Sequence, residues 1–277
     1  MRAVAILAVV LSSLAVQTPA RASEFWEEVR HPGLGAFRHH VERAQERLRA
    51  GNAERALREA DRAIDALAGR CEGHLMRGRA LGELGSLEAA AEALASAVDR
   101  DATCADAPEH GGPAAEVAAR AGQYALADAI LARTLRLMRG GPERRALYAL
   151  HGDVLLALGP DRLAEAIRAY EQVLRHQRSV RAALGLALAL RRADRAAEAE
   201  VVAREAVTRG RVDALVARLP LPLAEKKARL AVALDVTGDR EGARRAWAGA
   251  SEGPAWRAHA RRERERLTPP PAGGRAP

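Results

Sequence analysis

Residues 44–63 read AQERLRAGNAERALREADRA, and the stretch that begins 34 positions later, residues 78–97, reads GRALGELGSLEAAAEALASA. Small residues coincide at four pairs of positions, which are Ala44/Gly78, Gly51/Gly85, Ala56/Ala90 and Ala63/Ala97. Each stretch contains two amphipathic segments separated by a glycine-centred turn. A repeat of this length is typical of stacked helix–turn–helix units, because one unit cannot bury its apolar face alone. The sequence therefore predicts an all-helical repeat protein.

Four further units follow in a compatible register. The expected repeats span residues 37–70, 71–104, 108–141, 145–180, 180–213 and 224–257. Asp194 stands at the turn position that glycine occupies in other units. Between the fifth and sixth units, residues 219–222 read LPLP, and proline lacks the backbone donor and clashes with the preceding turn. We expect the stack to bend or split there.

These residues resemble the tetratricopeptide repeat, whose small residues stand where helices A and B of one repeat and helix A of the next approach closely. The resemblance covers most of the chain, although the proline that commonly closes a repeat is replaced, for example by Ala68 and Ala102. It implies an all-α fold, a right-handed α-solenoid of about six repeats. Repeats one to five would occupy 37–213, and repeat six with a C-terminal capping helix would occupy 214–267. A helical bundle with coincidentally spaced small residues is the alternative.

The first 22 residues have the order of a secretory signal peptide. Arg2 supplies a positive start, residues 3–16 form a short apolar run, and Ala20 and Ala22 are small residues at the positions that a signal peptidase reads. We expect cleavage before Ser23 and a periplasmic or secreted protein. The apolar run is shorter than the ~20 residues that span a bilayer, so a membrane anchor is disfavoured. A buried N-terminal helix is the alternative.

The remaining composition favours a helical body with a charged surface. Residues 23–36 form an N-terminal flank, and residues 268–277 form a Pro/Gly tail that we expect to be disordered. The chain has 44 Lys+Arg against 36 Asp+Glu. The charges alternate along helices, as in residues 262–266 (RERER), which is typical of a solvated, ion-paired surface. Because no aromatic-studded basic strand accompanies the arginines, we expect no nucleic-acid binding, and we expect no stable membrane span.

The sequence contains no recognisable catalytic motif. There is no GxSxG, no GxxxxGK[ST], no GxGxxG after a strand and no HExxH, so we expect no catalytic residues, no cofactor and no metal. Cys71 opens the second repeat and Cys104 closes it. Export favours a disulfide between them. Unpaired thiols remain an alternative, as does a metal site that includes His74 and His110.

The resemblance also implies which residues face the concave groove of the stack. In the fifth repeat these are Arg181, Leu184, Leu188, Arg191 and Arg192, a leucine strip beside three arginines. We predict that this patch binds an extended or helical protein segment with acidic and apolar residues. The alternative is that the leucines fill the stack and the arginines are solvated.

Together these features predict a non-enzymatic, exported scaffold for protein–protein interaction, with cell-envelope assembly as one setting. The alternative function is an arginine-rich binder of anionic polymers or membrane surfaces, which strong salt sensitivity would mark. An enzyme would require a deep pocket with converging polar groups.

Overall fold

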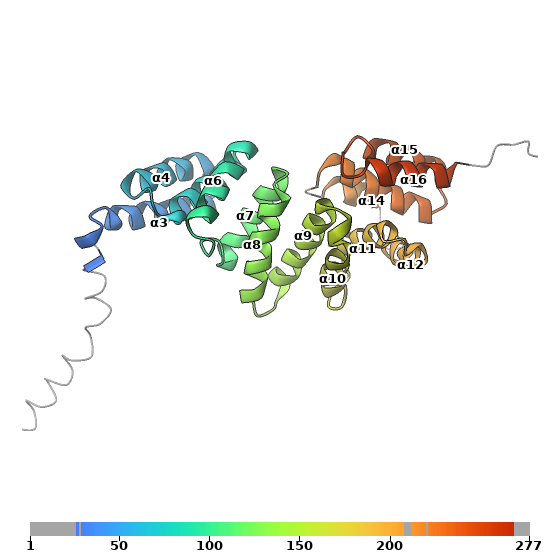
Figure 1. Cartoon of the computed structure of the whole chain (residues 1–277), viewed down its shortest axis with the longest axis horizontal. Helices are drawn as coiled ribbons and strands as arrows, with labels where there is room; N and C mark the ends of the chain where they lie inside the picture. The colour runs from blue at the N-terminus through green and yellow to red at the C-terminus, as the bar shows by residue number, and fades with distance from the viewer. Residues whose placement is uncertain (1–25, 28, 208–211, 220, 269–277) are drawn as a thin grey trace, which may run out of the picture. The chain divides into compact units, whose positions relative to one another are not determined.

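The computed structural model describes residues 26–27, 29–207, 212–219 and 221–268. Within these ranges the secondary structure is helical and contains no strand (Figure 1). The expected signal peptide, its cleavage site at Ser23 and residues 269–277 of the tail lie outside the described residues. None of the helices in the described ranges combines the length and the apolar character that crossing a membrane requires.

The chain divides into two compact units, Met1–Cys104 and Ala105–Pro277. The first unit contains two helical hairpins, α3 with α4 and α5 with α6, and α5 also contacts both helices of the preceding hairpin. The bounds are α3 Leu34–Arg49, α4 Ala53–Ala66, α5 Cys71–Glu83 and α6 Leu87–Arg100. Each hairpin is one helix–turn–helix repeat, with a first (A) helix and a second (B) helix.

The second unit repeats the same pattern. The A helices are α7 Pro108–Arg120, α9 Pro142–Leu158, α11 Val180–Arg192 and α14 Leu223–Val236. The B helices are α8 Tyr124–Leu137, α10 Leu163–Leu174, α12 Ala196–Val207 and α15 Arg240–Ala250. The short helices are η1 Pro160–Arg162 and α13 Val212–Ala217, and the last helix is α16 Arg257–Leu267. Although residues 219–222 interrupt the helical pattern, α11 and α14 contact each other, so the stacking of A helices continues past them.

The turn between the two helices of a repeat requires a left-handed backbone. Gly51, Gly85, Gly122 and Gly238 have φ angles between 69° and 88° at this turn. Asp194, which replaces glycine in the fifth repeat, has the same left-handed conformation with φ 59°. Asp is among the few non-glycine residues that tolerate this region, because its short polar side chain can bond locally. The substitution therefore preserves the turn.

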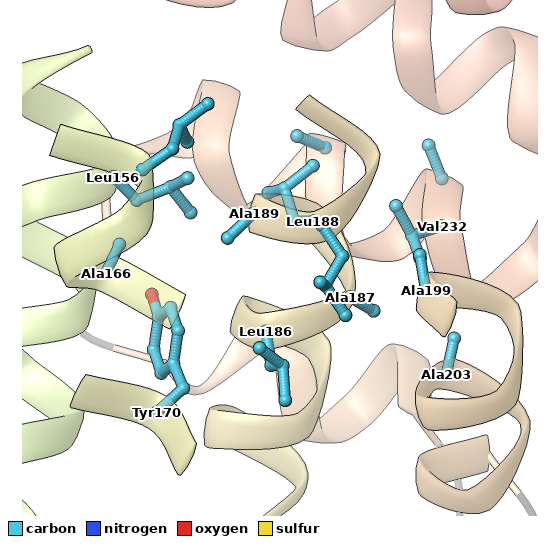
Figure 2. Close-up of a cluster of buried hydrophobic side chains, with 14 of the residues drawn as sticks. Leu156, Ala166, Tyr170, Leu186, Ala187, Leu188, Ala189, Ala199, Ala203 and Val232 are labelled. Carbon is cyan, nitrogen blue, oxygen red and sulfur yellow. The ribbon is translucent and has the colours of Figure 1, made fainter. Parts of the chain in front are cut away.

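Close helix approach in the second unit depends on two glycines that face one aromatic ring. A Cβ atom on Gly152 of α9 would lie 2.6 Å from Tyr170 Cε1, and a Cβ atom on Gly185 of α11 would lie 2.4 Å from Tyr170 Cζ. The ring of Tyr170, on α10, thus occupies the volume that two missing side chains leave. Figure 2 shows Tyr170 of α10 in the buried cluster to which Leu186 and Leu188 of α11 also belong.

Helix α16 covers the apolar end of the last repeat. Trp256 and Leu267 are buried there, and the ring of His259 meets the ring of Trp247 edge-on with centroids 5.3 Å apart. Burial lowers the pKa of His259 to about 3, with the nearby arginines adding to the shift. The histidine is therefore neutral at physiological pH and acts as part of the apolar contact.

The two cysteines lie at the first and last positions of the second repeat and are joined in the structure. Cys71 begins α5, Cys104 follows α6, and their Cα atoms are 6.0 Å apart with the sulfurs in disulfide geometry. His74 Nε2, a ligand in the alternative metal site, is 3.4 Å from the Ala68 carbonyl oxygen. Among the described residues, no group of three His, Cys, Asp or Glu side chains could hold a metal ion.

We predict that thiol titration of the unfolded, non-reduced protein finds no reactive thiol and that reduction releases two. The disulfide closes a loop with a sequence separation of 33 residues, so its reduction should lower the free energy of unfolding of the first unit by about 3 to 4 kcal/mol. Urea denaturation with and without reductant measures this difference. Two reactive thiols before reduction would show that the cysteines are unpaired.

Candidate functional site

The leucine strip that we expected on the groove of α11 is not exposed, and this expectation is wrong. Leu184 and Leu188 are both 0% exposed and belong to the buried clusters of the second unit. Figure 2 shows Leu188 within the cluster that also contains Val232 of α14. Their role is to fill the stack, because helix A of the sixth repeat packs against helix A of the fifth.

The three arginines of the same patch bond within the protein. Arg191 is 8% exposed and pairs with Asp235 of α14 at 2.5 Å and with Glu263 of α16 at 3.0 Å. Arg192 donates to the Leu156 carbonyl oxygen at 2.8 Å, and its guanidinium lies 4.7 Å from the ring centroid of Trp256. The patch therefore holds α11 against its neighbours and does not present free cations to an acidic segment.

Arg181, the last member of the patch, belongs to a buried charge cluster centred on Asp153 of α9. Arg181 Nη2 is 2.5 Å from Asp153 Oδ2, and the hydroxyl of Tyr170 donates to Asp153 Oδ1 at 2.7 Å. The third donor to Asp153 is Arg229 of α14, which is 0% exposed. The cluster therefore joins α9, α10, α11 and α14 through one carboxylate.

Arg229 also connects this carboxylate to a second buried acid. It donates to Glu225 Oε1 at 2.8 Å, to the Tyr170 hydroxyl at 3.0 Å and, through Nη1, to the Arg181 carbonyl oxygen at 2.7 Å. Burial raises the pKa of Glu225 to about 7, and Arg229 opposes the shift. Burial also raises the pKa of Tyr170 well above its ordinary value, so the phenol stays protonated and can donate.

Beside this cluster, α7 and α9 enclose an open groove of about 700 Å³. Its floor is apolar, and Leu150 is the most deeply buried of the leucine and methionine side chains that line it. A Cβ atom on Gly112 of α7 would lie 2.9 Å from Leu147 Cδ2, so the glycine lets the two helices approach at this point. The lining residues are Pro108, Glu109, Gly112, Pro113, Glu116, Met138, Glu143, Ala146, Leu147, Leu150 and Arg181.

The rim of the groove is acidic. Glu109, Glu116 and Glu143 are exposed, and within the described part of the chain none of them has a basic partner within 4 Å. Arg181, the one cation among the described residues that line the groove, is already bound to Asp153. An acidic rim around an apolar floor suits a ligand that carries positive charge and apolar side chains.

Some of the positions that the resemblance places on the concave face of the third and fourth repeats do line this groove. They are Glu109, Gly112 and Glu116 in the third repeat and Ala146 in the fourth. The prediction fell on the fifth repeat because its leucines and arginines resemble a binding surface. The repeat positions indicated the groove, whereas the leucines and arginines of the fifth repeat were misleading.

The described helices thus form an all-α protein built from helix–turn–helix repeats. Comparison with solved structures identifies the fold as that of tetratricopeptide-repeat proteins. A structure of a MamA mutant has a TM-score of 0.51 at 18% sequence identity, covering 61% of this chain and 95% of that one. A second MamA structure, from AMB-1, has a TM-score of 0.50 at 17% identity, covering 66% and 98%.

PilF from Pseudomonas aeruginosa has a TM-score of 0.48 at 16% identity and covers 83% of this chain and 99% of that one. No protein-family model matches the sequence, and no curated protein sequence matches it either. At these identities, the likeness to the MamA structures establishes the fold alone.

We predict that replacing Arg229 by Met lowers the free energy of unfolding of the second unit by about 3 to 5 kcal/mol, because Asp153 and Glu225 would remain buried without their shared cation. The matched control is Arg245→Met on α15, which breaks an exposed pair with Glu241 and should cost less than about 1 kcal/mol. Urea denaturation followed by circular dichroism compares the two variants. Equal stabilities would show that the buried cluster does not hold the helices together.

Proposed function

We propose that this protein is an exported, non-enzymatic scaffold that binds a segment of a partner protein in the groove between α7 and α9. The observation that carries the proposal is the combination of an open 700 Å³ groove, an apolar floor and a rim of unpaired glutamates. Grooves between helices bind peptides by burying apolar side chains, while charges on the rim select the partner.

The chemistry of the groove favours a partner segment with apolar residues flanked by lysine or arginine. The acidic segment that we expected from α11 lacks support, because Arg181 and Arg191 are engaged in internal ion pairs. In contrast, the carboxylates of Glu109, Glu116 and Glu143 have no basic partner in the described chain and can accept one from a ligand.

The arrangement of the buried acids supports a binding role over a catalytic one. Asp153, the buried partner of the groove residue Arg181, already accepts bonds from two arginines and a tyrosine. Glu225 is also buried and bonded to Arg229. Both oxygens of Asp153 are thus occupied, and neither acid lines the groove as a general base would have to.

Export is part of the proposal and rests on the signal-peptide pattern of residues 1–22. The pairing of Cys71 with Cys104 supports it, since disulfides persist in oxidising compartments. A scaffold in the cell envelope would be exported by such a signal and would lie in an oxidising compartment.

We predict that neutralising the rim weakens peptide binding. A phage-displayed peptide library selected on the purified protein should give apolar peptides with lysine or arginine. The triple variant Glu109→Gln/Glu116→Gln/Glu143→Gln should lower their affinity at least tenfold, measured by fluorescence anisotropy at low salt, because it removes the charges that face the basic residues.

Two variants control this experiment. Glu83→Gln/Glu88→Gln/Glu92→Gln changes the net charge equally on exposed residues of the first unit and should leave the affinity unchanged. Leu147→Glu in the groove should abolish binding, whereas Val201→Glu, on the exposed face of α12, should not. Selected peptides that bind the triple variant and Leu147→Glu as tightly as the native protein would refute the groove as the site.

We also predict that the exported protein begins at Ser23. Mass spectrometry of protein isolated from the producing cell should give a mass that lacks residues 1–22, because Ala20 and Ala22 allow the peptidase to act. Replacing Ala22 by Arg should block the cleavage. A mature chain that retains its first residues would contradict the export signal.

A further inference from the structure

A second, smaller pocket lies at the turn between α8 and α9. It shares no lining residue with the acidic groove. It has a volume of about 260 Å³. The lining residues are Arg139, Gly140, Gly141, Arg144, Arg145, Tyr148, Gln172 and His176. The pocket contains no acidic lining residue, which makes it the electrostatic opposite of the groove.

The three arginines of this pocket have in common that no acidic side chain of the described chain pairs with them. Two other arginines of the third and fourth repeats do pair with acids, Arg133 with Asp106 and Arg162 with Glu165. Among the residues that the structure describes, Arg139, Arg144 and Arg145 have no carboxylate within 4 Å. Three guanidinium groups around one cavity make a positively charged site that attracts an anion.

Two of these arginines are held in place by uncharged partners. The guanidinium of Arg144 lies 5.3 Å from the ring centroid of Tyr148, and its Nε is shielded from solvent and has no hydrogen-bond acceptor. Arg145 donates through Nε to the amide oxygen of Gln177 at 3.1 Å. Its two terminal nitrogens therefore remain available, and an arginine held in this way loses little side-chain entropy when it binds.

Backbone N–H groups at the mouth of the pocket add hydrogen-bond donors, which favour an anion as the arginines do. Gly140 and Gly141 have φ angles of 144° and 107°, a conformation that glycine adopts without strain. Helix α9 begins at Pro142 directly after them. Pro142 has no N–H and the Arg145 amide donates to the Gly141 carbonyl oxygen at 3.3 Å, so the amides of Glu143 and Arg144 are the ones without an intrahelical acceptor at the positive end of the helix dipole.

We propose that this pocket binds a phosphoryl group, presented by a small phosphorylated molecule or by a lipid headgroup. A phosphoryl oxyanion carries up to two negative charges and three acceptor oxygens, which match the bidentate guanidinium groups and the first-turn amides. The pocket is large enough for the phosphoryl group and a short substituent. The proposal is independent of the groove, whose charge has the opposite sign.

Isothermal titration calorimetry with inorganic phosphate and with glycerol 3-phosphate tests the site, at a constant ionic strength set with sodium chloride. Saturable binding to the full protein is expected, and Arg144→Gln/Arg145→Gln should weaken it at least tenfold. The control, Arg244→Gln/Arg245→Gln, removes the same charge from two exposed arginines of α15 and should leave it unchanged. Arg139→Gln changes an exposed side chain and serves as the site variant if the double variant does not fold.

Vesicles of phosphatidylcholine with phosphatidic acid distinguish the two sources of the phosphoryl group. Sedimentation with these vesicles that inorganic phosphate displaces would assign a lipid headgroup, whereas binding of the soluble phosphates alone would assign a small molecule. Phosphate binding that is equal in the native protein, the site variants and the control, or that chloride reproduces, would overturn the proposal.

Discussion

The carboxylate of Asp153 is the interaction on which the second unit depends most. It lies on α9 and accepts hydrogen bonds from Tyr170 of α10, Arg181 of α11 and Arg229 of α14. Removing charges from water is costly, and a buried acid is tolerated only when several donors satisfy it. Because these donors come from successive repeats, the carboxylate can be satisfied only when the repeats stack in one register. The cluster also holds Arg181 at the edge of the acidic groove.

The same region shows how an alanine-rich chain builds a packed interior. Gly152 and Gly185 leave the space that the ring of Tyr170 fills, so the large and small residues of neighbouring helices are complementary in shape (Figure 2). Elsewhere Ala44, Ala56 and Ala63 are completely buried in the first unit, where small side chains allow close helix contact. Thin layers of this kind need few large apolar residues.

The net positive charge of the chain is a poor guide to its surface. Many arginines are bound to acids of neighbouring helices, as Arg191 is to Asp235. Charge that is not paired within the described chain gathers at two places. These are the acidic rim of the apolar groove between α7 and α9 and the basic pocket at the start of α9. Helix α9 contributes residues to both sites, so a ligand at its first turn and a ligand on its groove face would contact the same rigid element. The two proposed sites would select ligands of opposite charge.

The sequence by itself determined the repeat and its turns. The recurrence of small residues predicted helix–turn–helix units and placed Asp194 at the glycine position of a turn, where the structure has a left-handed backbone. Both depend on local geometry, since a close helix contact or a positive φ restricts the residue that can occupy the position. The sequence also placed Cys71 at the start and Cys104 at the end of one repeat.

Only the tertiary structure decided which surfaces are free. The sequence presented Leu184, Leu188 and Arg191 as a binding patch, but α14 and α16 cover this face and supply its acidic partners. Asp235 lies far from Arg191 along the chain, and no periodic pattern reveals such a pair. Whether an arginine is bound or available depends on its neighbours in space, and therefore the groove and the basic pocket could be recognised only in the folded protein.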